Sequence, residues 1–295
     1  VFDTQNGELT FYSKYKVRDS RKGGYGKIPI TEIFERSSNT GMVQAIYDQY
    51  KKKPEQFVNR LMNMGLSEPL GLPIVGEGKP LIPHPDKNGW SGISLPWMAY
   101  GYGVLLTPMQ ILTFYNAIAN DGVMVKPRFI ERTQDAWSKM KRNSEVEIIS
   151  ASVCSKETIG KAKSLLKGVV EKPWGTAHNI YDPNFAIAGK TGTCQLDYNT
   201  EEIQYVASFV GYFPSDRPKY SCIVLVHRPN KEKGYFGSTV AAPVFQKIAH
   251  KLYSSIPVET RLSRERYLEI TQRKMETSKG VIDAKVDVTK TQNKS

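Results

Sequence analysis

The chain has 295 residues, of which 40% are hydrophobic, so it can bury a sizeable core and is not an intrinsically disordered polypeptide. Its 41 Lys and Arg against 29 Asp and Glu give a net charge of +12, which attracts polyanions in general. It contains no zinc-finger spacing, no RNA-binding signature and no basic stripe interleaved with aromatic residues, which argues against a nucleic-acid partner.

The first part of the chain is typical of short strands followed by helices. Residues 1–30 alternate β-like runs with turns. Residues 30–50 carry apolar side chains at helical spacing on either side of Ser37-Ser38-Asn39, which prefer caps and loops, so we expect two helices with a break between them. Residues 54–65 indicate another short helix, closed by glycine. Residues 67–97 are rich in Pro and Gly and predict a long loop or lid.

The next part of the chain alternates helices with strands. Thr107-Pro108 predicts a helix start, with Thr as the cap and Pro at the first helical position, and Asn120-Asp121-Gly122 ends that helix. An extended segment and a charged connector then lead to about Ser150. An amphipathic helix, three β-like runs and a last helix follow at residues 157–170, 185–194, 205–213, 220–228 and 239–253. The turn Pro214–Pro218 makes the last two strands a hairpin, and the apolar stretch 222–226 predicts a strand buried on both faces.

We expect these elements to form one domain over residues 1–256. Residues 257–295 are charged and contain few aromatics, which predicts a C-terminal tail that is largely disordered. No run of about 20 apolar residues, as a membrane-spanning helix would need, is present. The sequence begins at Val1 with neither an initiator methionine nor a leader, so we expect it to derive from a longer chain.

One stretch near the end of the domain concentrates chemically useful residues. An apolar run is followed by Gly189, Lys190, Thr191, Gly192 and Thr193. Glycine inside a strand indicates that another backbone or a ligand approaches closely. The lysine supplies a cation and the threonines supply hydroxyls beside main-chain N–H groups, which suits an anionic acyl donor and its developing oxyanion. The alternative is an ordinary edge strand with one solvated lysine, since so short a motif matches easily.

Together with this stretch, several other segments resemble penicillin-binding proteins. Lys190-Thr-Gly-Thr193 follows a strand and Ser37-Ser38-Asn39 separates two helices, as the third and second motifs of that family do. The amino-acid sequence also resembles that of the family at Tyr100–Gln110, Ala119–Gly122, Trp174–Ala177, Phe209–Gly211 and Ala241–Phe245. The resemblance covers roughly residues 20–255 and is strongest to the class B, division-associated type. It implies the α/β fold of serine β-lactamases and penicillin-binding-protein transpeptidases, with antiparallel strands packed against helices, here incomplete.

The resemblance implies catalytic roles for the second motif. Ser37 and Asn39 match the family's Ser-x-Asn pattern. Ser37, held near Lys190, would pass a proton between the nucleophile and the leaving amine, and Asn39 would hydrogen-bond the amide of the acyl donor. A Ser/Asn capping break between helices is compatible with both roles.

The third motif would bind the substrate through Lys190, Thr191, Gly192 and Thr193. Lys190 and Thr191 would hold the carboxylate of the acyl donor, and the Thr193 backbone N–H would supply half of the oxyanion hole. Lys190 and Thr193 therefore count as catalytic groups as well. Cys194 departs from the alanine that the family pattern leads us to expect, and we expect it to be a small buried apolar residue.

The family's nucleophile, a serine in a Ser-x-x-Lys pair at a helix N-terminus, has no good match in the sequence. Ser13–Lys16 lies upstream of the second motif, but in a polar β-like stretch. Ser138–Lys141 and Ser164–Lys167 lie downstream, in the charged connector and on an amphipathic helix. We therefore expect the catalytic serine to lie outside this chain. Its segment's absence would leave residues 220–228 with an unpaired edge and a hollow under the helix at Met109–Ile118.

The activity implied by the resemblance is peptidoglycan D,D-transpeptidation. The complete enzyme would cross-link stem peptides through a serine acyl-enzyme during cell-wall synthesis and division, β-lactams would acylate the same serine, and this chain alone would be inactive. The expected partners are stem peptides, β-lactams and proteins of the division or elongation complex. The expected location is the extracytoplasmic face of the plasma membrane, with an anchor outside this chain.

Two kinds of alternative remain open at this point. One is a β-lactamase or a β-lactam-sensing receptor of the same fold, and the other is a non-catalytic partner in the division complex. We expect neither a metal nor another cofactor, because the four histidines lie far apart in the sequence. The three cysteines, Cys154, Cys194 and Cys222, likewise match neither a disulfide framework nor a metal site.

Overall fold

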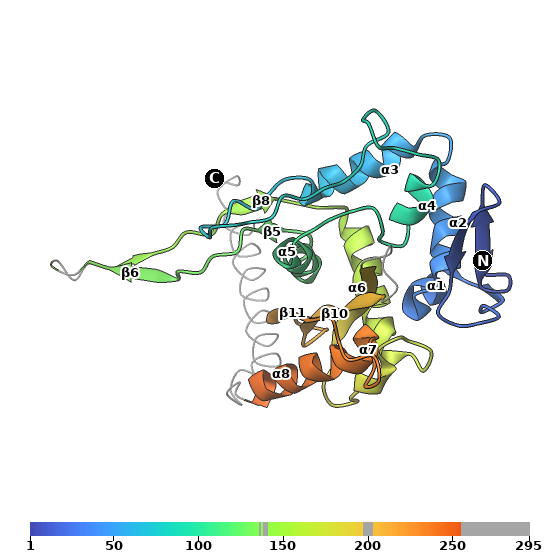
Figure 1. Cartoon of the computed structure of the whole chain (residues 1–295). Coiled ribbons are helices and arrows are strands. Elements are labelled where there is room, and N and C mark those ends of the chain that lie inside the picture. Colours follow the sequence, from blue (N-terminus) through green and yellow to red (C-terminus); the bar gives the residue numbers. More distant parts are fainter. Residues whose placement is uncertain (136, 138–140, 197–202, 255–295) are drawn as a thin grey trace, which may run out of the picture. The chain divides into compact units, whose positions relative to one another are not determined.

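The structure is a computed structural model, drawn in Figure 1, in which residues Val1–Gln246 form one compact unit. It describes residues 1–135, 137, 141–196 and 203–254. The expected domain end at residue 256 and the expected tail at 257–295 lie outside the described residues. No helix in the described part of the chain is long and apolar enough to cross a bilayer.

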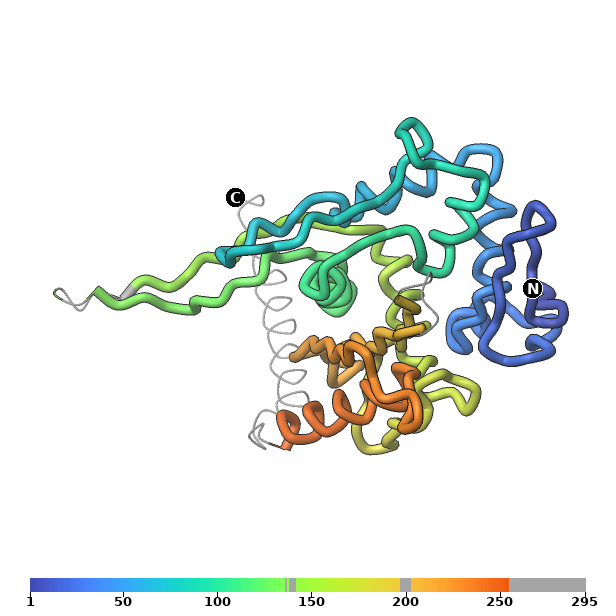
Figure 2. The backbone as a smooth tube through the Cα atoms, in the orientation of Figure 1, coloured from blue at the N-terminus to red at the C-terminus, as the bar shows by residue number. Residues whose placement is uncertain are grey.

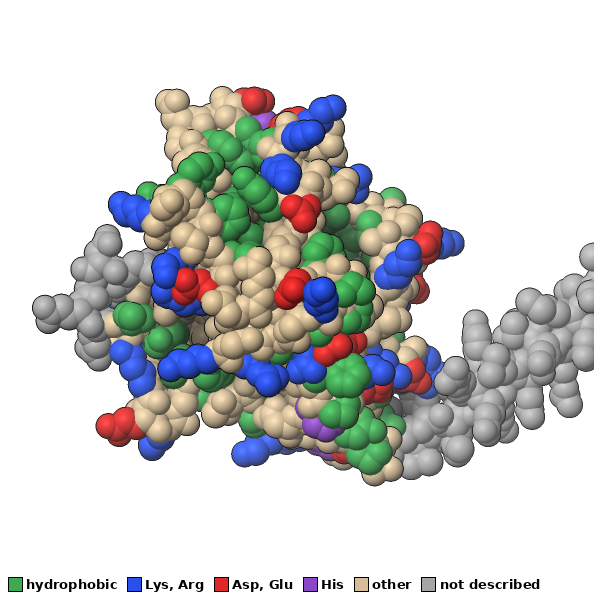
Figure 3. Space-filling view, turned by 90° about the vertical axis from the view of Figure 1, so that its right-hand side faces the viewer, with side chains coloured by type: hydrophobic (Ala, Val, Ile, Leu, Met, Phe, Trp, Pro, Cys, Tyr) green, Lys and Arg blue, Asp and Glu red, His purple; other side chains and the backbone are tan. Residues whose placement is uncertain are grey.

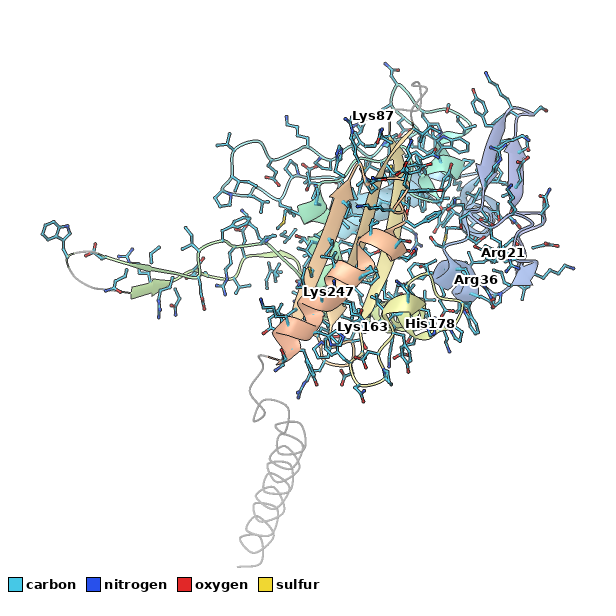
Figure 4. The ribbon with its side chains drawn as sticks, turned by 60° about the horizontal axis from the view of Figure 1, so that its bottom comes forward. Arg21, Arg36, Lys87, Lys163, His178 and Lys247 are labelled. Carbon is cyan, nitrogen blue, oxygen red and sulfur yellow. The ribbon has the colours of Figure 1, made fainter. Side chains whose placement is uncertain are left out.

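The largest sheet has three antiparallel strands in the order β11-β10-β9. The strands are β9 (Ala188–Leu196), β10 (Gln204–Phe213) and β11 (Tyr220–His227). The most buried strand, β10, lies in the middle, and Figure 4 shows the three strands side by side. Val210 pairs with Lys190 on one side and with Ile223 on the other. All three strands were predicted from the sequence, and the predicted hairpin is confirmed.

Alternate residues of β10 pack on opposite faces of the sheet. Phe209 and Phe213 contact Phe245 edge to face, with ring centroids 4.8 and 5.6 Å apart. Tyr212 faces the other way, into a cluster with Ile118 and apolar residues of a second helix. The helices concerned are α5 (Pro108–Ala119), α6 (Lys156–Glu171) and α8 (Ala242–Ser254). Burial of each large side chain in these layers contributes about 2 kcal/mol to stability.

The second motif lies at the junction of two helices, as the sequence predicts. They are α1 (Ile30–Arg36) and α2 (Asn39–Tyr50). Ser37 ends α1 in the left-handed conformation with φ 55°, and the Ser38 side chain caps α2 by accepting from the Gly41 N–H. Gly41 is required there because a β-carbon would lie 2.7 Å from the Ile33 side chain. The two helices therefore pack closely and hold the junction in one conformation.

Short strands precede these helices and make two two-stranded sheets, β1 with β4 and β2 with β3. They are β1 (Phe2–Asp3), β2 (Glu8–Phe11), β3 (Tyr15–Arg18) and β4 (Lys27–Ile28). After α2 come α3 (Pro54–Leu61), η1 (Met62–Leu66) and α4 (Ser94–Met98). The predicted long loop is confirmed over residues 67–93, which contain only an isolated bridge from Leu81 to Leu105, whereas its expected end at residues 94–97 is part of α4. Its Glu77 carboxylate accepts from the N–H groups of Leu70 and Leu72.

The charged connector before residue 150 is a two-stranded arm and not a loop (Figure 2). Its pairs are β5 (Met124–Val125) with β8 (Ile148–Ser150) and β6 (Arg132–Gln134) with β7 (Lys141–Asn143). The extended segment expected after Gly122 contains β5. The sequence did not reveal β6, β7 and β8, because their described residues are mostly exposed and show no alternation of apolar and polar types. The other elements are η2 (His178–Ile180) and α7 (Gly237–Val240).

Of the expectations about β11 and α5, one is wrong and two are confirmed. The strand is not buried on both faces, and Leu225 is 40% exposed, because the described residues cover its outer part incompletely. It does pair with β10 alone among the described strands. A cavity of about 310 Å³ also lies along α5, between Met109, Asn116, Val125 and Ser221. The expected hollow and the expected open edge are therefore both present.

Because the open edge of β11 carries exposed apolar side chains, we expect it to promote association of the isolated chain. Leu225→Lys should slow aggregation during incubation near the melting temperature, as followed by light scattering, while leaving the melting temperature within a few degrees. Val75→Lys changes a fully exposed apolar residue outside any sheet and serves as the control. Equal effects of the two substitutions on aggregation would contradict a role of the edge.

Candidate active site

Residues of the second and third motifs meet directly. The Lys190 Nζ donates a hydrogen bond to Ser37 Oγ at 2.8 Å and another to the Thr191 carbonyl at 3.1 Å. The two side chains are 153 positions apart in the chain. They meet because β9 ends its apolar run beside the α1–α2 junction, where the left-handed turn exposes the Ser37 hydroxyl. The predicted proximity of Ser37 and Lys190 is therefore present.

The Lys190 amine has an unusually low pKa for a lysine. Burial lowers its pKa from the usual 10.5 to about 8, because the charged form loses hydration. Its Nζ lies 5.8 Å from the centre of the Phe34 ring, and none of the described ion pairs includes it. An amine with this pKa exists in both protonation states near neutral pH. It can therefore give a proton to Ser37 or take one from it.

The other residues of the second motif are held by a carboxylate that the sequence did not single out. Asp19 accepts hydrogen bonds from Ser38 Oγ at 3.0 Å, from the Thr40 N–H at 3.0 Å and from Thr40 Oγ1 at 2.7 Å. Asn39 Nδ2 donates to the Arg18 carbonyl at 2.8 Å. The segment Arg18–Asp19 thus fixes the first turn of α2, and the carboxylate also suits the positive end of that helix.

The third motif lies on β9, which pairs only with β10 among the described strands. Thr191 Oγ1 lies 2.8 Å from Thr176 Oγ1, and Thr193 Oγ1 accepts from the Gly237 N–H at 3.1 Å. Gly192 and Gly237 allow a close backbone approach, since a β-carbon on Gly237 would lie 2.6 Å from the Gly192 carbonyl oxygen. The absence of a β-carbon at Gly237 therefore lets α7 pack against the strand, whereas a β-carbon on Gly192 would lie 2.5 Å from Ser208 Oγ of β10.

The orientation of the β9 backbone follows from one hydrogen bond. The Gln195 N–H donates to the Tyr102 hydroxyl at 3.2 Å, so it points away from β10. Along a strand, alternate N–H groups point the same way, and therefore those of Thr193 and Thr191 also face the open edge. The N–H and C=O groups of one strand residue point to the same side of the strand. The Thr191 carbonyl accepts a hydrogen bond from the Lys190 amine, which agrees with this orientation. The Thr193 N–H thus faces the open edge of β9.

The Ser-x-x-Lys strings take no part in this arrangement where the structure describes them. Ser13 is exposed in the turn between β2 and β3, with φ 55°, and Ser164 is exposed on α6. Ser138 lies outside the described residues. Lys190 contacts the Ser37 hydroxyl and neither Ser13 nor Ser164 through its described hydrogen bonds.

Cys194 is exposed, so the expectation that it is a buried apolar residue is wrong. Its position on β9 places its side chain outward next to the motif. The sequence also did not assign roles to Thr176, Tyr102 and Gly237, although Thr176 and Tyr102 lie in segments that it picked out. No group of three or more His, Cys, Asp or Glu in the described part of the chain could hold a metal ion.

Residues 1–250 match the family profile of the penicillin-binding protein transpeptidase domain. The chain belongs to this family. It is 30% identical over 243 residues to penicillin-binding protein PbpB of Mycolicibacterium smegmatis, covering 79% of this chain and 36% of that protein. It is 28% identical to stage V sporulation protein D of Bacillus subtilis, covering 83% of this chain and 37% of that protein.

A third relative is peptidoglycan D,D-transpeptidase FtsI of Escherichia coli, 26% identical over 83% of this chain and 38% of that protein. The chain thus spans just over a third of the length of these curated relatives. Among solved structures, penicillin-binding protein 3 of Mycobacterium tuberculosis aligns with a TM-score of 0.72 at 28% identity, covering 85% of this chain and 56% of that one. The same protein has been solved with ampicillin and with aztreonam. The family and the α/β transpeptidase fold expected from the class B resemblance are confirmed.

The Asp19 carboxylate should be a large contributor to the stability of the site. Asp19→Ala leaves the buried hydroxyls of Ser38 and Thr40 and one backbone N–H without their acceptor, so we expect a loss of about 3 kcal/mol in the free energy of unfolding. Urea denaturation measures it. Asp48→Ala, on the exposed side of α2, should cost less than about 0.5 kcal/mol. A cost for Asp19→Ala as small as the control's would contradict this assignment.

The lowered pKa of Lys190 makes stability depend on pH. Between about pH 8, the native pKa, and pH 10.5, the usual pKa, the unfolded chain binds more protons than the native chain, so the free energy of unfolding rises with pH. We expect this rise, on the order of 2 kcal/mol, to be absent in Lys190→Met and present in Lys161→Met, which removes an exposed lysine. Urea denaturation at several pH values measures it. Identical pH profiles for wild type and Lys190→Met would show that burial does not shift the amine.

Proposed function

We propose that this chain supplies the second and third motifs of a peptidoglycan D,D-transpeptidase, an enzyme that transfers the acyl group of one stem peptide to the amine of another. The observation that carries the proposal is the 2.8 Å contact between the Lys190 amine, whose pKa is about 8, and Ser37 Oγ. If Lys190 only attracted a negative charge, it would not need a serine hydroxyl beside it. Transfer of a proton between a nucleophile and a leaving amine does need such a hydroxyl.

The roles of the site residues follow from this contact. Ser37 relays the proton, with Lys190 setting its acidity, and protonates the departing terminal D-Ala amine. The Lys190 charge and the Thr191 hydroxyl bind the carboxylate of the acyl donor, beside the bare backbone of Gly192. The Thr193 N–H, which faces the open edge of β9, donates to the oxyanion of the tetrahedral intermediate. Asn39, whose Nδ2 donates to Arg18, presents its carboxamide oxygen to the amide of the donor.

The proposal includes a serine nucleophile from a segment that these 295 residues do not contain. It is supported by the positions of Ser13 and Ser164, which are exposed and make no described hydrogen bond to Lys190. It is also supported by the cavity along α5 and by the open edge of β11, since both are places where a further segment would pack. With that segment the enzyme forms a serine acyl-enzyme, and without it this chain is inactive.

β-Lactams are the proposed inhibitors, because they present a carboxylate and a reactive acyl group in the positions of the donor peptide. The support is the likeness to penicillin-binding protein 3 of M. tuberculosis, which has been solved with ampicillin and aztreonam. Carboxylate binding by Lys190 and Thr191 gives this chain weak reversible affinity for such ligands even without the serine.

The proposed setting is the cell envelope, at the extracytoplasmic face of the plasma membrane, with an anchor outside this chain. Peptidoglycan stem peptides are found there, and the relatives include a sporulation protein and a D,D-transpeptidase. The proposed protein partners belong to the division or elongation complex. Nucleic acid is not a proposed partner, since on the face shown in Figure 3 Lys and Arg side chains are interspersed with Asp and Glu.

The proposal is tested with a fluorescent penicillin and denaturing electrophoresis. The 295-residue chain should remain unlabelled, since no described serine is held beside the Lys190 amine except Ser37, which acts as the proton relay. The full-length protein should be labelled stoichiometrically. In that protein Lys190→Met should reduce the rate of labelling by at least about 100-fold, on the scale of one lost oxyanion or charge contact.

Two results would overturn the proposal. One is stoichiometric labelling of the 295-residue chain that mass spectrometry maps to Ser13, Ser138 or Ser164, because one of these strings would then carry the nucleophile. The other is labelling of the full-length protein at the wild-type rate in Lys190→Met. Lys161→Met serves as the control for the loss of a positive charge, and it should label at the wild-type rate.

A further inference from the structure

Glu35 carries a buried carboxylate two residues before Ser37. The residue is 6% exposed, and its Oε2 accepts a hydrogen bond from the Trp174 indole Nε1 at 2.6 Å. Its Oε1 lies against α6 at Gly168, where a β-carbon would be too close to this oxygen unless the Glu35 side chain moved. Arg36, the adjacent cation, pairs with Glu32. Burial of a carboxylate without a cation is unfavourable, so an apolar residue would serve stability better here.

The same residue binds the loop between α6 and η2 a second time. The Glu35 carbonyl accepts from the Thr176 N–H at 3.1 Å. Trp174 and Thr176 are two residues apart, so one residue of α1 holds this loop at two points. The Trp174 ring also lies 5.7 Å from the guanidinium of Arg36, the last residue of α1, which is labelled in Figure 4. The loop is therefore tied to the segment that leads into Ser37 by side-chain and main-chain contacts together.

Thr176 is the point at which this loop reaches the third motif. Its Oγ1 is 2.8 Å from Thr191 Oγ1, and one of the two hydroxyls must donate to the other. Each hydroxyl has one hydrogen and two lone pairs. When Thr176 donates, the hydrogen of Thr191 is left to bind a carboxylate. When Thr191 donates, only its lone pairs remain, and these repel a carboxylate.

We propose that Glu35 is a positioning residue. Through Trp174 and Thr176 it holds the α6–η2 loop so that the Thr191 hydroxyl directs its hydrogen toward the carboxylate of the acyl donor. This inference rests on the proposed function, because it needs the Thr191 hydroxyl to bind that carboxylate. It assigns Glu35, Trp174 and Thr176 no contact with the substrate.

The test compares acylation of the full-length protein by a penicillin with its free carboxylate and by the methyl ester of the same penicillin. In Thr176→Val and in Trp174→Phe, the ratio of the two second-order rate constants, acid over ester, should fall about tenfold, the effect of one hydrogen bond to a charged group. Thr176→Ser keeps the hydroxyl and should restore the ratio. A merely structural role would lower both rate constants together and leave their ratio unchanged.

The Glu35 variants distinguish the loss of a hydrogen-bond acceptor for Trp174 from the loss of the negative charge. Glu35→Gln keeps an acceptor for the indole N–H and should keep a ratio near that of wild type, whereas Glu35→Leu should lower it as Trp174→Phe does. If Glu35→Leu fails to fold, Trp174→Phe decides, because it removes the indole N–H and keeps an aromatic ring in place. Circular dichroism establishes which variants are folded.

Two matched controls remove equivalent groups elsewhere. Thr158→Val deletes a hydroxyl that lies 2.9 Å from Ser155 Oγ at the start of α6. Trp137→Phe deletes an indole N–H from a residue that is 93% exposed. Neither should change the ratio of acid to ester.

The possible failures are distinguishable. Absence of any acylation of the wild-type full-length protein would overturn the proposed function and this inference with it. Normal acylation of wild type, together with an unchanged ratio in folded Thr176→Val and Trp174→Phe, would leave the proposed function standing and show that the positioning role is wrong.

Discussion

The hydrogen bond from the Lys190 amine to the Ser37 hydroxyl is the interaction on which the site depends. It requires a lysine partly removed from water, and that removal is unfavourable for the charged form. The same removal lowers the pKa of the amine to about 8. Within the described ion pairs no carboxylate offsets the charge, so hydrogen bonds to Ser37 and the Thr191 carbonyl are what stabilise it. A carboxylate partner would raise the pKa and remove the ability to exchange protons near neutral pH.

Much of the surrounding structure holds the two ends of this hydrogen bond in place. Ser37 occupies a left-handed turn, a conformation that a serine adopts only when its surroundings determine it. Asp19 holds the next turn of chain from one side, and Glu35 ties the preceding turn to the α6–η2 loop from the other. Lys190 is placed by pairing of β9 with β10, whose aromatic side chains are packed on both faces. Polar contacts therefore orient the side chains of the site. Apolar burial keeps the strands and helices rigid, so that these contacts hold the site in one geometry.

Local patterns account for the elements that were predicted correctly. The Thr107 cap with Pro108 and the break at Ser37-Ser38-Asn39 are encoded within a few residues. The structure confirms the start of α5 and the boundary between α1 and α2. The apolar runs of β9, β10 and β11 likewise identified their strands. The strands β6, β7 and β8 were not predicted because their residues show no alternation of apolar and polar types. The burial of β11 was overestimated because composition does not reveal what covers a strand.

The sequence by itself determined the family, the two motifs and the residues that carry charge or hydroxyls in them, because these are short patterns with a fixed order of residue types. Only the tertiary structure decided which groups meet. The contacts of Asp19 with Ser38 and Thr40, of Thr176 with Thr191 and of Glu35 with Trp174 join segments whose separation carries no local signal. The direction of the Thr193 N–H was also undetermined, since a shift of one residue in the pairing of β9 would turn that group toward β10. The packing of the whole sheet selects the register between β9 and β10, which a motif of four residues cannot determine by itself.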